Sequence, residues 1–365
     1  MNNNNYNNKN NTLNLAVMGI MGTGLLSALF GFVNAQSGDP TVIETTSHRF
    51  TQMAEGVYQV TGTGAVNVMS NALLVVGEND VLVVDSHVTP NAANALLNSI
   101  PAVTNKPVRY LVNSHYHFDH AHGNQVLPPD VEIIGHEYTR AKLNGELGNV
   151  LEESTHISFT EGVPGQIANL ERQIAETSDA AQRATLQTQL GVAQAHLTSL
   201  REVIPTPPNI TLETKMTLFQ TVMQGSREIQ LLHIGRGHTA GDVVVFLPQE
   251  RMVFTGDLML PGLSYMGDSF PQEWPATLEQ LKSLDFDIIL PGHGAPLQGK
   301  EKIDHFQAYL GDLWQKTEAM KARGLTAEET AAQIDMTNHA DNYAQIRGPG
   351  ADVRAIRRIY TLLDE

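Results

Sequence analysis

The stretch Asn113-Ser114-His115-Tyr116-His117-Phe118-Asp119-His120 places three histidines and one aspartate within six positions. It follows the apolar, β-branched run 108–112, which predicts a buried strand. In an extended segment the two imidazoles of His-x-His lie on the same side, because side chains alternate with period two. Imidazole and carboxylate groups are ligands for zinc and similar metals. We interpret the stretch as a metal-binding loop at a strand end. The alternative is a chance cluster on a solvated loop.

Three later segments repeat this arrangement of a predicted strand, a glycine and one side chain of a metal-ligand type. They carry His238 after Gly237, Asp257 after Gly256, and His293 after Gly292. Glycine lets the backbone turn sharply or pass close to a bound group. We therefore expect these side chains to join the His-rich loop at one end of the sheets.

With these residues the chain resembles the metallo-β-lactamase superfamily. The resemblance runs from about Val57 to about Pro296, and the matching ligand positions are, in order, His115, His117, Asp119, His120, His238, Asp257 and His293. It implies an α/β (α+β) fold of four αββα layers, with two packed mixed sheets and helices outside. The metals would lie at one edge of the sheet sandwich.

The resemblance also implies a catalytic centre with two zinc ions. His115, His117 and His238 would bind the first, Asp119, His120 and His293 the second, and Asp257 would bridge them. A metal-bound hydroxide, oriented by Asp119, would attack a carbonyl carbon. Iron and manganese remain alternatives to zinc, because they accept the same donors.

The sequence predicts the class of reaction but not a single substrate. Antibiotic-hydrolysing branches of the family often have a cysteine, or no carboxylate, where this chain has Asp257; glyoxalase II and lactonases have the bridging aspartate. The expectation is a zinc-dependent hydrolase acting on an ester, thioester, lactone or β-lactam carbonyl. One alternative is an iron-dependent oxygenase or oxidoreductase of the same superfamily, although di-iron members usually have glutamate where His117 stands. The other is a non-catalytic metal-binding protein.

The composition limits which kinds of binding partner and ligand the chain can have. The chain has 365 residues, 41% of them hydrophobic and 17% charged, which is ample for a sizeable core. A formal net charge of −16 argues against nucleic acid as a partner, since a phosphate backbone binds a basic surface. The sequence has no cysteine, which excludes disulfides and thiolate ligands. A small-molecule substrate is expected.

The N-terminus predicts export. An asparagine-rich start precedes an apolar run, 13–33, which ends at Val33-Asn34-Ala35. This pattern is typical of a signal peptide cleaved after Ala35, which would leave a periplasmic or secreted protein without membrane contact. An uncleaved membrane anchor is the alternative. A mature mass beginning near Gln36 would distinguish the two.

The remaining chain, 36–365, is predicted to be one domain. Residues 36–50 read as an exposed lead-in. Residues 162–209 have apolar positions at helical spacing and predict an inserted helical hairpin, either a lid or homodimer arm or a surface excursion. Helices are expected near 303–321, 327–334 and 353–363, within a C-terminal helical region at about 302–363.

Several residues are candidates to surround the metals. Asp85 ends a predicted buried strand and could hydrogen-bond a ligand imidazole from behind or cap the next helix. Met69 lies in the loop 61–71, which in the resembled family often covers the metals, although a plain hairpin is the alternative. Met259 and Tyr265 follow Asp257 in an apolar loop expected to form a pocket wall; the alternative is that part of this loop belongs to the core. His122 matches no ligand position, and Arg236 is the nearest cation in sequence for a substrate carboxylate.

Overall fold

Two β-sheets form the centre of the fold in the computed structural model, which describes residues 41–223 and 225–365. Within these residues the first sheet has eight strands in the order of the sequence, and the second has six in the order β14-β13-β12-β11-β10-β9. Strands β1 to β5 pair antiparallel, whereas β5, β6, β7 and β8 run parallel. The His-rich loop follows β6, which lies between β5 and β7 in the parallel part of this sheet.

The strands of the first sheet are β1 (Val42–Glu44), β2 (His48–Ala54), β3 (Val57–Gly62), β4 (Ala72–Val76), β5 (Val81–Val84), β6 (Val108–Val112), β7 (Glu132–His136) and β8 (Ile210–Leu212). Those of the second are β9 (Lys215–Val222), β10 (Gly225–Leu232), β11 (Val244–Leu247), β12 (Met252–Gly256), β13 (Ile288–Pro291) and β14 (Leu297–Gln298).

The α-helices are α1 (Pro90–Ser99), α2 (Phe118–Ala121), α3 (Glu137–Leu143), α4 (Ser154–Thr160), α5 (Val163–Glu176), α6 (Ala180–Leu200), α7 (Trp274–Ser283), α8 (Glu301–Ala322), α9 (Ala327–Gln333) and α10 (Val353–Asp364). Short 3-10 helices are η1 (Ile100–Ala102), η2 (Asn124–Val126), η3 (Val150–Glu152) and η4 (Thr337–His339). Within the described ranges, each helix is too short or too polar to cross a bilayer.

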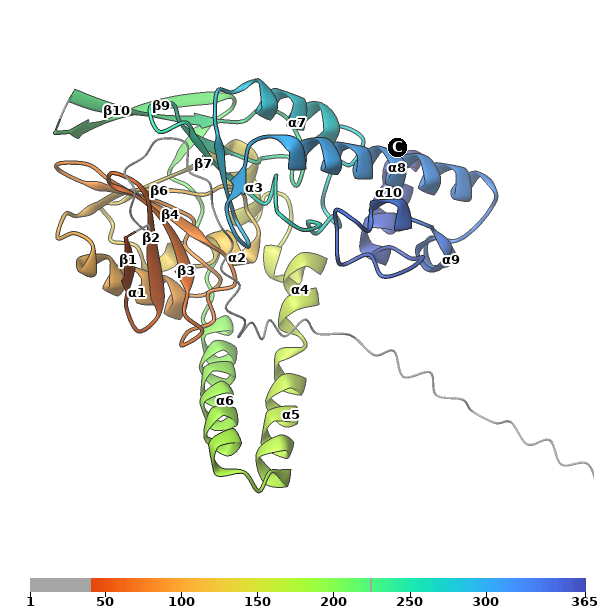
Figure 1. Cartoon of the computed structure of the whole chain (residues 1–365), viewed down its shortest axis with the longest axis horizontal. Helices are drawn as coiled ribbons and strands as arrows, with labels where there is room; N and C mark the ends of the chain where they lie inside the picture. The colour runs from red at the N-terminus through yellow and green to blue at the C-terminus, as the bar shows by residue number, and fades with distance from the viewer. Residues whose placement is uncertain (1–40, 224) are drawn as a thin grey trace, which may run out of the picture. The chain divides into compact units, whose positions relative to one another are not determined.

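Alternating side chains divide the core into layers. In β4, Leu73 and Val75 pack between the two sheets, whereas Ala72 and Leu74 pack in the cluster that includes α1. The outer face of the second sheet packs against α7 and α8 around Trp274. Figure 1 shows these two helices lying along that sheet. The arrangement is the expected αββα sandwich, and the predicted fold class is confirmed.

The predicted helical hairpin is present as α5 and α6, which lie side by side in Figure 1. The apolar faces of the two helices pack against each other, because Leu170, Leu186 and Ala193 form a cluster separate from the main core. The Ser199 hydroxyl, near the end of α6, accepts the backbone N–H of Asn91 in α1 at 3.0 Å, which ties the base of the hairpin to the domain. A homodimer through this hairpin stays a prediction.

The lead-in expected at 36–50 differs from the structure. Residues 42–44 and 48–54 form β1 and β2, which extend the first sheet, and the side chains of His48 and Phe50 are fully buried. Phe50 packs in the cluster beneath α1, so this segment is held by core burial as well as by strand pairing. The predicted signal peptide at 1–35 lies outside the described residues.

Candidate metal centre

The seven predicted ligands converge on one point in the structure. They come from the loop after β6 and from α2, from the loop between β10 and β11, and from the ends of β12 and β13. Their donor atoms form three overlapping groups, and within each group the atoms lie within 4.8 Å of one another: His115, His117 and His238; His115, His120 and Asp257; and Asp119, His120 and His293. Six of the seven side chains are buried and His293 is partly exposed, so the centre opens to solvent beside His293.

The first group consists of three imidazoles. His117 Nδ1 and His238 Nε2 are 2.9 Å apart, and the buried Nε2 of His115 has no hydrogen-bond partner among the described residues. In two of the rings the other nitrogen contacts a polar side chain. Ser114 Oγ lies 3.0 Å from His115 Nδ1, and Asp268 Oδ2 lies 3.3 Å from His117 Nε2. These contacts leave His115 Nε2, His117 Nδ1 and His238 Nε2 facing one another.

The second group adds carboxylates to imidazoles. His293 Nε2 lies 3.0 Å from Asp119 Oδ2 and 3.3 Å from His120 Nε2. Asp257 lies between the two groups, since its Oδ1 is 3.4 Å from His120 Nε2 while its Oδ2 is 3.3 Å from His293 Nε2 and 3.8 Å from His238 Nε2. A carboxylate in this place can contact cations on both sides.

The electrostatics of the centre favour bound cations. Burial raises the pKa of Asp119 and of Asp257, but the surrounding imidazoles outweigh it and hold both pKa values well below the ordinary range. Burial lowers the pKa of His293, but Asp257 and Asp119 outweigh that and raise it to about 10. Two ionised carboxylates in a buried site therefore depend on positive charge beside them.

The donor set fits divalent metal ions. Imidazole nitrogens 2.9 and 3.3 Å apart point at each other, and the buried Oδ1 of Asp257 has no hydrogen bond to a described residue. Neutral imidazole and carboxylate are the donors that zinc takes in catalytic sites. The chain could hold two such ions, one in each group, with Asp257 between them.

Asp85 supports the second group from behind. Its Oδ2 lies 2.7 Å from His120 Nδ1, and its carboxylate accepts the Ser114 N–H at 2.7 Å and the Ser114 hydroxyl at 2.8 Å. The helix that follows is capped instead by Thr89, whose side chain accepts the Ala92 N–H. Asp85 adopts the left-handed backbone conformation, with φ of 67°, which is uncommon for a residue other than glycine.

We expect Asp85→Asn to weaken metal binding by about 10- to 100-fold, the usual loss when a group that orients a ligand is changed. Asparagine keeps the size of the side chain and tolerates a positive φ, so the change isolates the lost charge. Competition with a chelating dye measures the affinity. The matched control is Asp130→Asn, because Asp130 is exposed on a loop. Equal affinities in the two variants would contradict the role of Asp85.

Asp268 is a residue that the sequence did not single out. It contacts His117 Nε2 and accepts a hydrogen bond from the Thr155 hydroxyl of α4. Burial raises the pKa of Asp268, but its contacts with His117 outweigh this and bring it to about 2. A glycine, Gly267, precedes this aspartate, but no strand does, and its partner lies 151 positions earlier in the chain.

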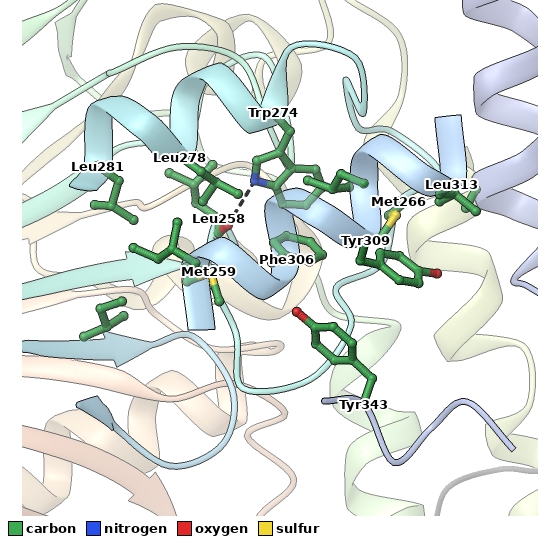
Figure 2. Close-up of a cluster of buried hydrophobic side chains, with 14 of the residues drawn as sticks. Leu258, Met259, Met266, Trp274, Leu278, Leu281, Phe306, Tyr309, Leu313 and Tyr343 are labelled. Carbon is green, nitrogen blue, oxygen red and sulfur yellow. Dashed lines mark hydrogen bonds between the residues drawn. The ribbon is translucent and has the colours of Figure 1, made fainter. Parts of the chain in front are cut away.

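The three residues predicted to line the pocket lie in different surroundings. Tyr265 is placed edge-on to the His117 ring, with the ring centroids 5.9 Å apart. Met69 is half-buried and packs beside Phe118. Met259 is a correction: it is fully buried in the core around Trp274 (Figure 2), because the loop after Asp257 turns inward beneath α7 and α8. Arg236 forms an exposed ion pair with Glu273.

His122 lies near the centre without joining its ligand groups, since its ring centroid is 6.3 Å from that of Phe118. His122 is buried, and neither of its ring nitrogens has a hydrogen-bond partner among the described residues. Its ring centroid is 5.5 Å from that of His156 in α4. His136 instead caps α3, since its Nδ1 accepts the Tyr138 N–H at 3.0 Å.

Comparison with known proteins agrees with this geometry. The sequence model of the metallo-beta-lactamase superfamily matches residues 65–293. A linear primary-alkylsulfatase from Pseudomonas sp. (strain ATCC 19151) is 22% identical over 77% of this chain and 53% of its own length. A type 2 metallo-beta-lactamase from Bacteroides fragilis is 28% identical over 27% of this chain and 41% of its own.

A solved structure shows the same fold. The inverting sec-alkylsulfatase from Pseudomonas sp. superimposes with a TM-score of 0.56 at 16% identity, covering 86% of this chain and 50% of the alkylsulfatase. The chain thus spans about half the length of the alkylsulfatases it matches.

Proposed function

The chain belongs to the metallo-β-lactamase superfamily, and from this premise we propose that it is a zinc-dependent hydrolase that cleaves an ester, thioester, lactone or β-lactam carbonyl. The observation that carries the proposal is the position of Asp257, whose carboxylate oxygens lie 3.3 to 3.8 Å from donor nitrogens of both groups of ligands. Bridged pairs of metals are typical of hydrolytic centres.

In this proposal His115, His117 and His238 hold the first ion, and Asp119, His120 and His293 hold the second. Bound zinc supplies Lewis acidity, which lowers the pKa of water to about 7 and polarises the substrate oxygen. Asp119 is the catalytic candidate of the chain itself. Its carboxylate lies 3.0 Å from His293 Nε2 and would be ionised beside a bound cation, so it could accept a hydrogen bond from the attacking water and orient it.

Sulfate-ester hydrolysis is the second candidate function. The alkylsulfatase relative aligns with 77% of this chain, a longer match than that of the β-lactamase. The same residues could serve this reaction, because a metal pair with an ionised carboxylate can activate water against a sulfate ester as well as a carbonyl.

The test is a hydrolysis panel on zinc-loaded protein together with its metal content. The panel contains a lactone, a thioester, a carboxylate ester, several β-lactams and a primary alkyl sulfate. Two zinc ions per chain and turnover of a carbonyl substrate are expected. Turnover of the alkyl sulfate alone would replace the first candidate with the second. Two bound zinc ions without any turnover would favour a non-catalytic metal-binding protein, and iron in the native protein would favour an oxygenase.

Export is proposed separately, from the signal-like segment at 1–35. The mature chain is then periplasmic or secreted and begins near Gln36. An intact mass of the native protein that includes residues 1–35 would contradict cleavage.

A further inference from the structure

Two neighbouring residues, Ser70 and Asn71, each bind a different segment of the proposed second metal group. The Ser70 hydroxyl donates to the backbone carbonyl of Asp119 at 2.6 Å. The backbone N–H of Asn71 donates to the carbonyl of Gly292 at 2.7 Å. Ser70 and Asn71 are buried and lie just before β4. A single dipeptide therefore contacts both the helix that carries Asp119 and the turn that carries His293.

The side chain of Asn71 adds two bonds to the same turn. Its Nδ2 donates to the carbonyl of Pro291 at 3.0 Å and to that of Gly294 at 2.9 Å. The turn is also held from the other side, because the N–H of Gly292 donates to the carbonyl of Gly256 at 2.8 Å. A Cβ at Gly292 would collide with Asp257 Oδ1, so the turn lies directly against the carboxylate. Asn71 thus bonds to the backbone on both sides of His293.

A chain of buried groups sets the orientation of the Ser70 hydroxyl. The single proton of Ser70 goes to Asp119, so His87 Nδ1, 3.2 Å away, must donate to Ser70. His87 Nε2 is then an acceptor, and His48 Nε2 donates to it at 3.2 Å. Ser47 Oγ lies 2.9 Å from His48 Nδ1 and completes the chain as a donor. With both imidazoles neutral, the bonds from Ser70 to His48 have one consistent assignment, whereas Ser47 Oγ also lies 3.1 Å from Ser99 Oγ.

Three residues around this dipeptide adopt a strained backbone conformation, which the surrounding contacts must stabilise. Met69, Asp85 and His87 all have φ between 63° and 67°, and among the described residues the one other non-glycine residue with positive φ is Arg251. Met69 directly precedes Ser70, and His87 hydrogen-bonds the Ser70 hydroxyl. Such conformations persist where the surrounding structure enforces them, and they occur often at functional sites.

From these contacts we propose that Ser70 and Asn71 form a positioning clamp, which sets the separation of Asp119 and His293 and thereby the affinity for the second metal. The proposal rests on the two-metal function above. Neither residue contacts the metals or the substrate in this role. Ser70 acts through Asp119, and Asn71 acts through His293.

The test compares Asn71→Ala and Ser70→Ala with the wild type in the full chain. Each variant should bind the second zinc about 10- to 100-fold more weakly, while the affinity for the first stays unchanged. Competition with a chelating dye gives the two affinities. Cobalt substitution provides a spectroscopic signature, because visible bands of the second ion should change in the variants and those of the first should not.

Asn209→Ala is the matched control. It also removes an asparagine that binds the backbone, since Asn209 Oδ1 accepts the Ile133 N–H at 2.8 Å, but its bonds go to β7 and not to a segment that carries a ligand. It should lower the melting temperature of the metal-free protein without changing either zinc affinity. In a His293→Ala background, Asn71→Ala should cause no further loss of metal affinity, because its effect passes through His293.

The clamp is overturned if Asn71→Ala and Ser70→Ala weaken both metals equally, if they leave both affinities unchanged, or if they behave as Asn209→Ala does. A wild-type chain that binds fewer than two ions would overturn the two-metal function and the clamp together. Two ions in the wild type with unaffected variants would overturn the clamp alone.

Discussion

Asp257→Ala is expected to reduce bound zinc from two ions to about one per chain and to lower turnover by more than about 100-fold, beyond the usual effect of a residue that only orients a ligand. The second ion should be lost first, because Asp119, His120 and His293 remain there without a shared carboxylate. The first ion keeps three imidazoles. Asp257 contacts donors of both groups at 3.3 to 3.8 Å, so its removal also takes away the charge that separates the two ions.

Metal analysis after gel filtration and steady-state kinetics measure the two effects. Asp312→Ala is the control, because Asp312 also contacts an imidazole, His339 Nε2 at 3.0 Å, but in the helical layer away from the ligands. It should keep two zinc ions and full turnover. Asp85→Asn and His122→Ala should lie between this control and Asp257→Ala. Near-normal turnover with two metals in Asp257→Ala would show that both the bridging assignment and the two-metal mechanism are wrong.

Trp274→Ala is expected to destabilise the metal-free protein by about 3–5 kcal/mol, the cost of removing a fully buried large aromatic side chain. Trp274 is completely buried at the start of α7, where its ring packs edge-on against Phe306 at 5.1 Å (Figure 2). Its Nε1–H donates to the carbonyl of Leu258 at 3.0 Å, and that buried carbonyl would lose its partner. The His238 ring lies 5.7 Å away, so the first metal group should loosen as well.

Urea unfolding of the metal-free chain measures this loss of stability. The chain has one other tryptophan, Trp314 in α8, which is partly exposed and provides the matched control. Trp314→Ala should cost less, because less apolar surface leaves the core. Trp274→Phe should also cost less than Trp274→Ala, since it loses the hydrogen bond but fills most of the volume. Equal free energies of unfolding for Trp274→Ala and Trp314→Ala would contradict the assignment of Trp274 to the core.

The strand ends and the residues that follow them could be predicted from the sequence. The segments that carry the ligands come after apolar strands, although Asp119 and His120 lie in α2 and His238 lies in the loop beyond β10. Local pattern therefore carries enough information to assign His115, His238, Asp257 and His293 to a single site. The helices near 301–322 and 353–364 were predictable for the same reason, because an amphipathic period reflects one buried face.

The supporting contacts depended on the tertiary structure. Asp268 reaches His117, and Asn71 reaches the turn at Gly292, across 151 and 221 positions of sequence. The sequence left open whether Met259 belongs to a pocket wall or to the core, and the burial of Phe50 could not be predicted. A periodic pattern reports which face of an element is apolar, but not which neighbour covers it.

The sequence by itself thus indicated the strand ends that carry ligand-type side chains, because strand periodicity and ligand chemistry are local properties, while the αββα fold and the set of seven ligands followed from the family resemblance of those motifs. The tertiary structure alone decided which groups hold those side chains in place. A hydrogen bond of about 3 Å between distant segments requires their backbones to be placed to within a fraction of an ångström, and that placement comes from the packing of the whole αββα core.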